Sequence, residues 1–298
     1  MTYRVWIIYN GFLQSDKFKD FADMFYQAAK DLGHEATIYR NDEIQMILAD
    51  EITVHTEAAL PDYVIFTDKD IYLAKQLELL GIPVFNSAET IEVSDDKIKT
   101  YQLLAEKGIP IPKTIVAPKT FGLPIALDDE FIQATIKLLG FPLVMKETFG
   151  SFGEQVYLVN NEAELHAQMK EIAGKPFMFQ QFIDSSYGVD LRLQVVGDKV
   201  VTAMKRVSEN DFRANVTSGG RMEPHEPSEQ EKAVAIQASQ AIDADFSGVD
   251  LLFGENGEPI VCEVNSNAHI RNILDCTGVD ASYDIIRYIE ERLGADQV

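Results

Sequence analysis

Hydrophobic and polar positions along the first third of the chain follow a rhythm that predicts a parallel sheet covered by helices. Short apolar runs of the kind found in buried strands alternate with stretches of helical period. Each of the two predicted helices is followed by a glycine, which is a common helix stop. The expected elements are strands at Val5–Tyr9, Glu35–Tyr39, Tyr63–Thr67 and Pro83–Phe85 and helices at Lys17–Leu32 and Ile71–Leu80. This β-α-β order indicates an α/β domain over residues 1–93.

The pattern changes after a predicted helix that begins at Ser94-Asp95-Asp96-Lys97 and runs to Lys107. Ser94 or Asp95 is expected to cap the start of this helix. Beyond it, apolar runs come in pairs around short glycine-containing turns, which indicates antiparallel hairpins. The expected strands are Leu143–Glu147, Gln155–Val159, Phe177–Ile183, Leu191–Val196, Lys199–Met204, Gly248–Phe253 and Pro259–Val264, and the expected helices are Ser228–Ala244 and Ala281–Leu293. We therefore predict an α+β remainder of two subdomains, residues 94–180 and 181–298.

Composition narrows the classes of partner. The chain has 298 residues, with 48 acidic residues against 26 basic ones and a net charge of −22. Such a surface repels nucleic acid and anionic membranes, so we expect neither as a partner. Cys262 and Cys276 have neither metal-ligand nor disulfide spacing, and the opening apolar run is too short for a signal peptide or a membrane span. We expect a cytoplasmic protein.

The predicted C-terminal hairpin carries a candidate metal site. Glu263 and Asn265 share one face of their strand, because side chains alternate, and Asp250 on the partner strand joins them if the register allows. Oxygen ligands of this kind suit Mg²⁺. Ordinary acids on a solvated hairpin face would give the same pattern, so these three residues alone do not decide between the two interpretations.

The predicted hairpin at 143–159 carries a candidate phosphate site. Lys146 ends an apolar strand, and the turn Phe149-Gly150-Ser151-Phe152-Gly153 follows it. Backbone N–H groups of such a turn can hold phosphate oxygens while the ammonium neutralises their charge. A plain hairpin with an exposed lysine is the alternative. The order of a Walker loop is absent.

A basic cluster opposes the sign of the whole chain. Lys205, Arg206, Arg213 and Arg221 lie close together in sequence, with Asn215 and Gly219-Gly220 between them, and Asp190 and Arg192 are expected on a common face one strand earlier. A charge run is usually a solvated face, but here it favours a local anion site. No nucleophilic Ser/His/Asp or Cys/His arrangement is evident.

In this order and spacing, the motifs resemble the ATP-grasp superfamily, and most closely its RimK-like amino-acid ligases. The resemblance covers roughly residues 90–290. It rests on Ser94-Asp95-Asp96-Lys97, Leu143-Val144-Met145-Lys146, Gly150-Ser151-Phe152-Gly153, Gln180-Gln181-Phe182-Ile183, Asp190-Leu191-Arg192 through Val201, Met204-Lys205-Arg206, Asp211 to Asn215, Gly219-Gly220, Gly248-Val249-Asp250 and Glu263-Val264-Asn265. It implies an α/β N-terminal domain followed by an α+β ATP-grasp fold of two subdomains.

The resemblance also implies site residues. Lys97 and Lys146 would bind the nucleotide, the strand at Gln180–Ile183 would meet adenine with Gln181 in place of the usual glutamate, and Asp190 would lie near the ribose. The full ATP set is Lys97, Lys146, Gly150, Ser151, Gly153, Gln180, Gln181, Phe182, Ile183, Asp190, Lys205 and Asn215; the metal ligands are Asp250, Glu263 and Asn265; and the catalytic residues are Arg206, Arg213 and Lys146.

The implied activity is ATP-dependent ligation of a carboxylate to an amine through an acyl phosphate. It would use ATP with two Mg²⁺ ions, or Mn²⁺ in their place, and would add glutamate or another amino acid to a peptide, protein or small-molecule carboxylate. A homo-oligomer is expected from the family. Many relatives follow Glu-x-Asn with a small residue, Pro and Gly, whereas this chain has Ser266 to Asn272, including His269 and Arg271. A carrier-protein ligase of the lysine or arginine pathway, or an ATP-binding regulatory protein without catalysis, are the alternatives.

Overall fold

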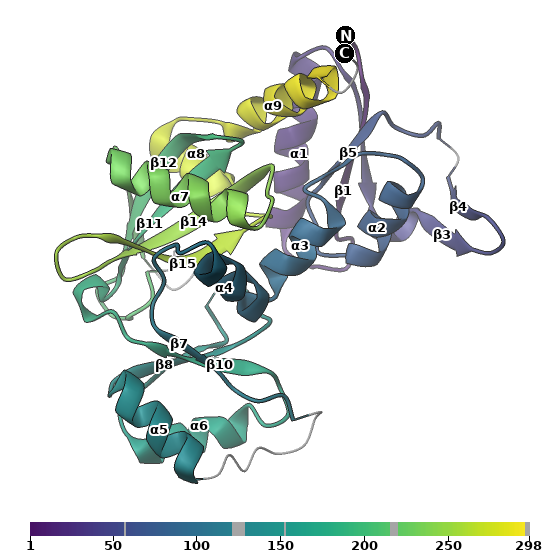
Figure 1. The fold of residues 1–298 in the computed structure, drawn as a ribbon. Helices are drawn as coiled ribbons and strands as arrows, with labels where there is room; N and C mark the ends of the chain where they lie inside the picture. Colours follow the sequence, from purple (N-terminus) through teal and green to yellow (C-terminus); the bar gives the residue numbers. More distant parts are fainter. Residues whose placement is uncertain (57, 121–128, 152, 215–219, 296–298) are drawn as a thin grey trace.

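A computed structural model describes the chain apart from residues 57, 121–128, 152, 215–219 and 296–298 (Figure 1). In the part of the chain so described, three larger sheets and one two-stranded ribbon make up the β-structure. No helix in the described part of the chain is long and apolar enough to cross a membrane.

The first sheet is the predicted parallel one. Its order is β2-β1-β5-β6, with β1 at Arg4–Tyr9, β2 at Glu35–Arg40, β5 at Tyr63–Phe66 and β6 at Val84–Phe85. The centre of β1 and all of β5 are buried, as expected for strands covered on both faces. Helices α1 (Asp16–Asp31) and α2 (Ile71–Leu79) provide that cover. The loops after β1 and β5 consequently emerge at the same edge of the sheet.

One predicted helix start is wrong. The chain forms α3 at Ala88–Asp95 and α4 at Lys97–Glu106, so Ser94 and Asp95 end one helix instead of starting the next. Asp96 separates the two helices, and its side chain accepts the N–H of Lys99 at 3.0 Å as the cap of α4. The Ser94 hydroxyl is used elsewhere: it donates to the carbonyl of Val264 at 3.0 Å, on the C-terminal hairpin.

The second sheet is antiparallel, with order β7-β10-β8-β9. Its strands are β7 (Thr114–Val116), β10 (Phe177–Gln181), β8 (Leu143–Glu147) and β9 (Val156–Val159), which confirms the hairpin predicted around the glycine turn. Helices α5 (Asp129–Leu139) and α6 (Glu162–Glu171) cover the face turned away from the rest of the chain (Figure 1). Leu143 and Met145 pack in the core of this unit, so the alternate residues of β8 face the other way.

The third sheet has five antiparallel strands in the order β13-β12-β11-β14-β15. They are β13 (Arg221–Pro224), β12 (Lys199–Val207), β11 (Val189–Val196), β14 (Phe246–Phe253) and β15 (Pro259–Asn265). Helix α7 (Glu229–Ala241) packs with Leu191 and Leu193 on one face. Helices α8 (Arg271–Thr277) and α9 (Ala281–Ala295) share a core with α1 and the other face. Both predicted hairpins of this region are confirmed.

Several short elements were not predicted. They are the exposed ribbon β3 (Gln45–Leu48) and β4 (Ile52–His55), the 3₁₀ turns Asn41–Glu43 and Asp184–Ser186, strands β7 and β13, and helices α3, α5, α6 and α8. The division into residues 1–93, 94–180 and 181–298 stays a prediction.

Candidate active site

Two adjoining clefts lie between the sheets. The first, with about 910 Å³ of space, opens between the second and third sheets, and the second, with about 2020 Å³, opens between the third sheet and the loops at the edge of the first. Lys97, Glu263 and the two turn glycines line both, so the clefts meet along this strip. The predicted residues that line the first cleft are Lys97, Lys146, Gly150, Gly153, Gln180, Gln181, Phe182, Ile183, Asp190, Arg213, Asp250 and Glu263.

Lys146 is turned into the first cleft by strand alternation, because Met145 points into the core behind it. The lysine is only 7% exposed. Its Nζ lies 3.5 Å from the Tyr101 hydroxyl, which itself donates to the Cys262 carbonyl at 2.7 Å. Among the described residues no carboxylate forms an ion pair with Lys146. The buried ammonium is thus available to an anionic ligand in the cleft.

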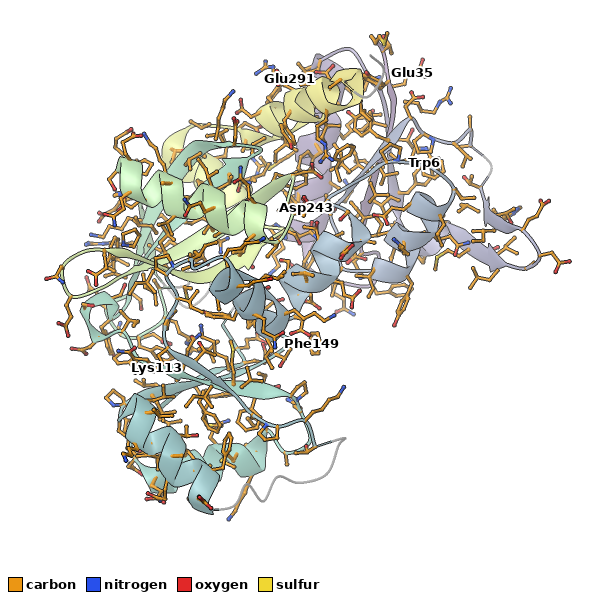
Figure 2. The ribbon with its side chains drawn as sticks, viewed as in Figure 1. Trp6, Glu35, Lys113, Phe149, Asp243 and Glu291 are labelled. Carbon is orange, nitrogen blue, oxygen red and sulfur yellow. The ribbon has the colours of Figure 1, made fainter. Side chains whose placement is uncertain are left out.

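Lys97 ties the glycine turn to the C-terminal hairpin. Its Nζ donates to the Gly150 carbonyl at 2.8 Å and lies 3.6 Å from a carboxylate oxygen of Glu263. Gly150 has φ +143°, a region that favours glycine, and a Cβ there would come within 2.2 Å of Gln155 Oε1. Phe149, labelled in Figure 2, belongs to the same turn and is half exposed. The turn therefore lies beside the junction of the two clefts.

Four charged side chains are linked on the cleft face of the third sheet, with Asp190, Arg206 and Asp250 buried and Arg192 partly buried. Asp190 accepts two bonds from Arg206 at 2.6 Å each, and Arg206 also lies 2.9 Å from Asp250. Asp250 accepts two further bonds from Arg192, at 2.5 and 2.7 Å. Asp190 lies opposite Arg206 on β12, and Arg192 lies opposite Asp250 on β14. The prediction that Asp190 and Arg192 share a face is therefore confirmed.

The pKa values of the two acids diverge within this chain. Burial raises the pKa of both carboxyls, and the arginines lower it. Asp250 is in contact with two arginines, and its pKa falls below the ordinary value. Asp190 has one direct arginine partner, and the pKa stays above the ordinary value. Asp250 is consequently held as a carboxylate, which is the form that a metal ion requires.

The predicted metal ligands lie on adjacent strands. Asp250 pairs directly with Glu263, and Gly248 pairs with Asn265. Asp250 and Glu263 line the first cleft, and Glu263 and Asn265 line the second. The Glu263 side chain is 34% exposed, and the Nδ2 of Asn265 is buried without a hydrogen-bond partner in the described structure. Two carboxylates and an amide are a hard oxygen donor set, so these residues fit Mg²⁺.

The remaining predicted residues are more dispersed. Arg213 donates to the Gly153 carbonyl at 2.5 Å and pairs with Asp211, whereas Arg206 and Ser151 line the second cleft. Lys205 lines neither cleft, because it alternates with Arg206 along β12 and faces the other side of the sheet. Asn215 lies outside the described residues.

The second cleft contains residues that sequence reasoning missed. The loop after β1 supplies Asn10, the loop after β5 supplies Asp68 and Lys69, and helix α1 supplies Asp20. They face the divergent loop from Ser266 to Asn272, whose Arg271 binds Asp20 with bonds of 2.7 and 2.8 Å. Their position in the predicted fold could have identified these residues, because ligands bind at the loops that follow the carboxyl ends of parallel strands.

His269 is packed against α1 in the same wall. Its ring lies 4.8 Å from that of Phe21 and 5.4 Å from that of Phe18. Burial, with the nearby charges of Lys17 and Arg192, lowers the pKa of His269 to about 4. The ring is therefore neutral at physiological pH and serves to hold the divergent loop against α1.

Comparison with known proteins agrees with this architecture. Residues 94–289 match the model of the RimK-like ATP-grasp domain. A probable alpha-L-glutamate ligase of Trichodesmium erythraeum is 35% identical over 226 residues, which cover 74% of this chain and 72% of the relative. An uncharacterized protein of Mycoplasma pneumoniae, a homolog of MG012, is 35% identical over 214 residues, or 70% and 73% of the two chains.

Solved structures show the same fold at low identity. The ATP-grasp ligase PsnB complexed with its minimal precursor superposes with a TM-score of 0.73 at 18% identity, covering 97% of this chain and 99% of that one. The D-alanine–D-alanine ligase of Bacillus anthracis complexed with ATP gives 0.72 at 17% identity, with both chains fully covered. The predicted fold class is confirmed.

Proposed function

The chain belongs to the RimK-like ATP-grasp family of carbon–nitrogen ligases, and from that premise we propose that it joins the amine of an amino acid to a carboxylic acid through an acyl phosphate. The observation that carries the proposal is the strip where the clefts meet. There Lys97 and the glycine turn, which are the predicted phosphate-binding elements, stand beside Glu263, with a separate cleft on either side.

The first cleft is proposed to bind ATP. Its lining includes Gln180–Ile183, at the end of β10, together with the turn glycines and Lys97. Adenine would lie at Gln180–Ile183, and the phosphates would approach Lys146, Lys97 and the glycine turn. Both carboxylate oxygens of Asp190 already accept hydrogen bonds from Arg206. In the proposed complex these oxygens would accept from the ribose hydroxyls in addition to Arg206.

We propose that Asp250, Glu263 and Asn265 hold magnesium. Two Mg²⁺ ions are predicted, and Mn²⁺ would be able to replace them. A bound divalent ion of this kind neutralises phosphate oxygens and orients them. The chain's own contribution is to keep Asp250 ionised through its contacts with Arg192 and Arg206.

The proposed reaction has two steps. An oxygen of the substrate carboxylate attacks the γ-phosphorus, the bond to the β–γ bridging oxygen breaks, and ADP leaves. The amine then attacks the acyl carbon, loses a proton, and phosphate leaves with the former carboxylate oxygen. Arg206, Arg213 and Lys146 are proposed to stabilise the developing negative charge. The proposed reaction requires no protein nucleophile.

The size of the second cleft supports an acceptor larger than a free amino acid. It has about 2020 Å³ of space against about 910 Å³ in the first cleft, and its walls come from both ends of the chain. PsnB, a structural neighbour, was solved with a precursor peptide. We propose a peptide or protein carboxylate as the acceptor and L-glutamate as the first amino acid to test, after the names of the relatives.

A matrix of amino acids against carboxylate acceptors tests the proposal, with ADP release and product mass as readouts. A productive pair should release one ADP per condensation and give a product lighter by one water than the sum of its substrates. Glu263→Gln should lose both signals, while Glu255→Gln, in the exposed turn of the same hairpin, should keep them. ATP binding without ADP release in every combination would instead favour the non-catalytic regulatory alternative.

A further inference from the structure

Asp68 is a buried carboxylate at the edge of the first sheet. It follows β5, lines the second cleft and is only 7% exposed. Asn10, on the neighbouring loop, donates its Nδ2 to both carboxylate oxygens at 3.1 and 3.2 Å. Burial raises the pKa of Asp68 above its ordinary value, although hydrogen bonds from the backbone N–H of Lys69, the side chain of Asn10 and the backbone N–H of Asp70, all neutral donors, lower it.

The other buried acids among the described residues all have a basic partner. Asp190 and Asp250 bind arginines, Asp245 binds Arg292, Glu147 binds Lys175 at 2.7 Å, and Glu231 lies 3.1 Å from His225. Within the described ranges, Asp68 is the one buried acid that no lysine, arginine or histidine pairs with. A buried carboxylate whose hydrogen-bond donors are all neutral is costly, so a positive charge in the cleft would stabilise it.

A second acceptor in the same wall also lacks a donor. The Nδ2 of Asn267 donates to the backbone carbonyl of Asp68 at 2.8 Å, which fixes the orientation of the amide. The Oδ1 of Asn267 is then left buried with no hydrogen-bond partner among the described atoms. Asn267 lines the second cleft as well. An ammonium group has three N–H donors and a positive charge, which matches what both acceptors lack.

The position of Asp68 places such an ammonium close to the proposed chemistry. The next residue, Lys69, lies 3.3 Å from the Ser151 hydroxyl in the glycine turn. On the other side, Asn267 is two residues beyond the proposed metal ligand Asn265. Asp68 is therefore connected through its neighbour Lys69 to the glycine turn, and through Asn267 to the end of the strand that carries the proposed metal ligands.

We propose that Asp68 and Asn267 bind the ammonium group of the amino-acid substrate in the second cleft. The inference rests on the proposed function and deepens it, since it assigns the amine to this cleft and to these residues. Arg192 lines the same cleft, and we assign it to the carboxylate of the same amino acid while its Nε and Nη2 remain bonded to Asp250. The site would accordingly select zwitterionic amino acids over acids of the same shape without an amino group.

Equilibrium binding tests this selection apart from turnover. The probes are L-glutamate against glutarate and L-alanine against propionate, titrated into the full chain with Mg²⁺ and a non-hydrolysable ATP analogue. Asp68→Asn keeps the shape and removes the charge. Asn267→Ala is the second variant. Asp70→Asn is the matched control, because Asp70 caps α2 by accepting from Leu73 N–H at 3.2 Å and asparagine caps equally well.

Wild type and Asp70→Asn should bind at least one amino acid more tightly than its partner acid by about ten- to hundredfold, the range of one charge-assisted hydrogen bond. Asp68→Asn should lose most of this preference, and Asn267→Ala part of it, while affinity for the ATP analogue stays unchanged. Preference retained in Asp68→Asn, or absent in wild type for both pairs, would overturn the proposal. Intact preference with no ADP release would contradict only the proposed function.

Discussion

Arg206 is the residue on which the order of the site depends most. The residue is 5% exposed and its guanidinium joins Asp190 to Asp250, so its loss would leave two buried carboxylates short of a partner. A buried ion pair is costly to break from one side, although its net contribution to stability is small. The residue was visible in the sequence as part of a basic cluster, but its partners were not, because they depend on the register of β11, β12 and β14.

Replacing Arg206 by Met should lower the free energy of unfolding by about 3–5 kcal/mol, since it removes one side of a buried pair. Urea unfolding of the purified variant measures this change. The control is Arg221→Met, which removes an exposed arginine from its pair with Glu223 and should cost about 0–1 kcal/mol. Equal costs for the two variants would contradict the structural role assigned to Arg206.

His269 makes the free energy of unfolding depend on pH. Its pKa is about 4 in the folded state against an ordinary value of 6.5, so the unfolded state binds more protons between these values. Stability from this residue is therefore complete above pH 6.5 and is lost as pH falls toward 4, by roughly 1–3 kcal/mol for a partly buried group. His269→Gln should flatten the fall in unfolding free energy between pH 6.5 and 4. An identical pH profile in the variant would exclude this assignment.

At the level of elements, the hairpins were predictable and the helix boundaries near the site were not. Strand pairs such as β8–β9 and β14–β15 are predicted by two apolar runs on either side of a glycine-containing turn. The α3–α4 break was missed because Ser94, Asp95 and Asp96 are all good caps, and only tertiary contact of Ser94 with Val264 selects Asp96. Helix α6 was missed because it buries only Leu165 and Met169 and has little helical periodicity.

The glycine turn is the element whose shape matters most to the proposed ATP site. Gly150→Ala would force a Cβ into Gln155 and strain a backbone at φ +143°. We expect kcat/KM for ATP to fall by roughly tenfold or more, because misplaced phosphate ligands are costly to catalysis. The stability loss should be only about 1 kcal/mol. Initial rates across ATP concentrations measure the first effect, and an unchanged kcat/KM would show that the turn does not contact the nucleotide.

At the scale of the whole molecule, the N-terminal sheet and the C-terminal helices share one core. Phe25 of α1 lies 6.2 Å from Phe246 of β14, and α9 packs in the same cluster. This arrangement puts the loops after β1 and β5 opposite the divergent loop and so creates the second cleft. No sequence pattern predicted it, because its N-terminal wall contains no motif and lies far in sequence from the divergent loop that faces it, as Asp68 does from Asn267. A homo-oligomer stays a prediction.

The shared core predicts cooperative unfolding of both ends of the chain. Phe25→Ala should cost about 3–5 kcal/mol as a fully buried aromatic truncation. Fluorescence of Trp6, the only tryptophan, reports the first sheet, and far-ultraviolet circular dichroism reports the whole chain. The two urea curves should shift together. A shift seen by Trp6 alone would indicate that the N-terminal sheet unfolds independently.

The transfer of oxygen from the substrate carboxylate to phosphate tests the central claim most directly. Once a productive substrate pair is known, its carboxylate is labelled with ¹⁸O and the released phosphate is analysed by mass spectrometry. An acyl-phosphate ligase should place one ¹⁸O atom in phosphate for each amide bond formed, and none in ADP. Amide formation with unlabelled phosphate, or with the label in AMP, would contradict the mechanism proposed for this site.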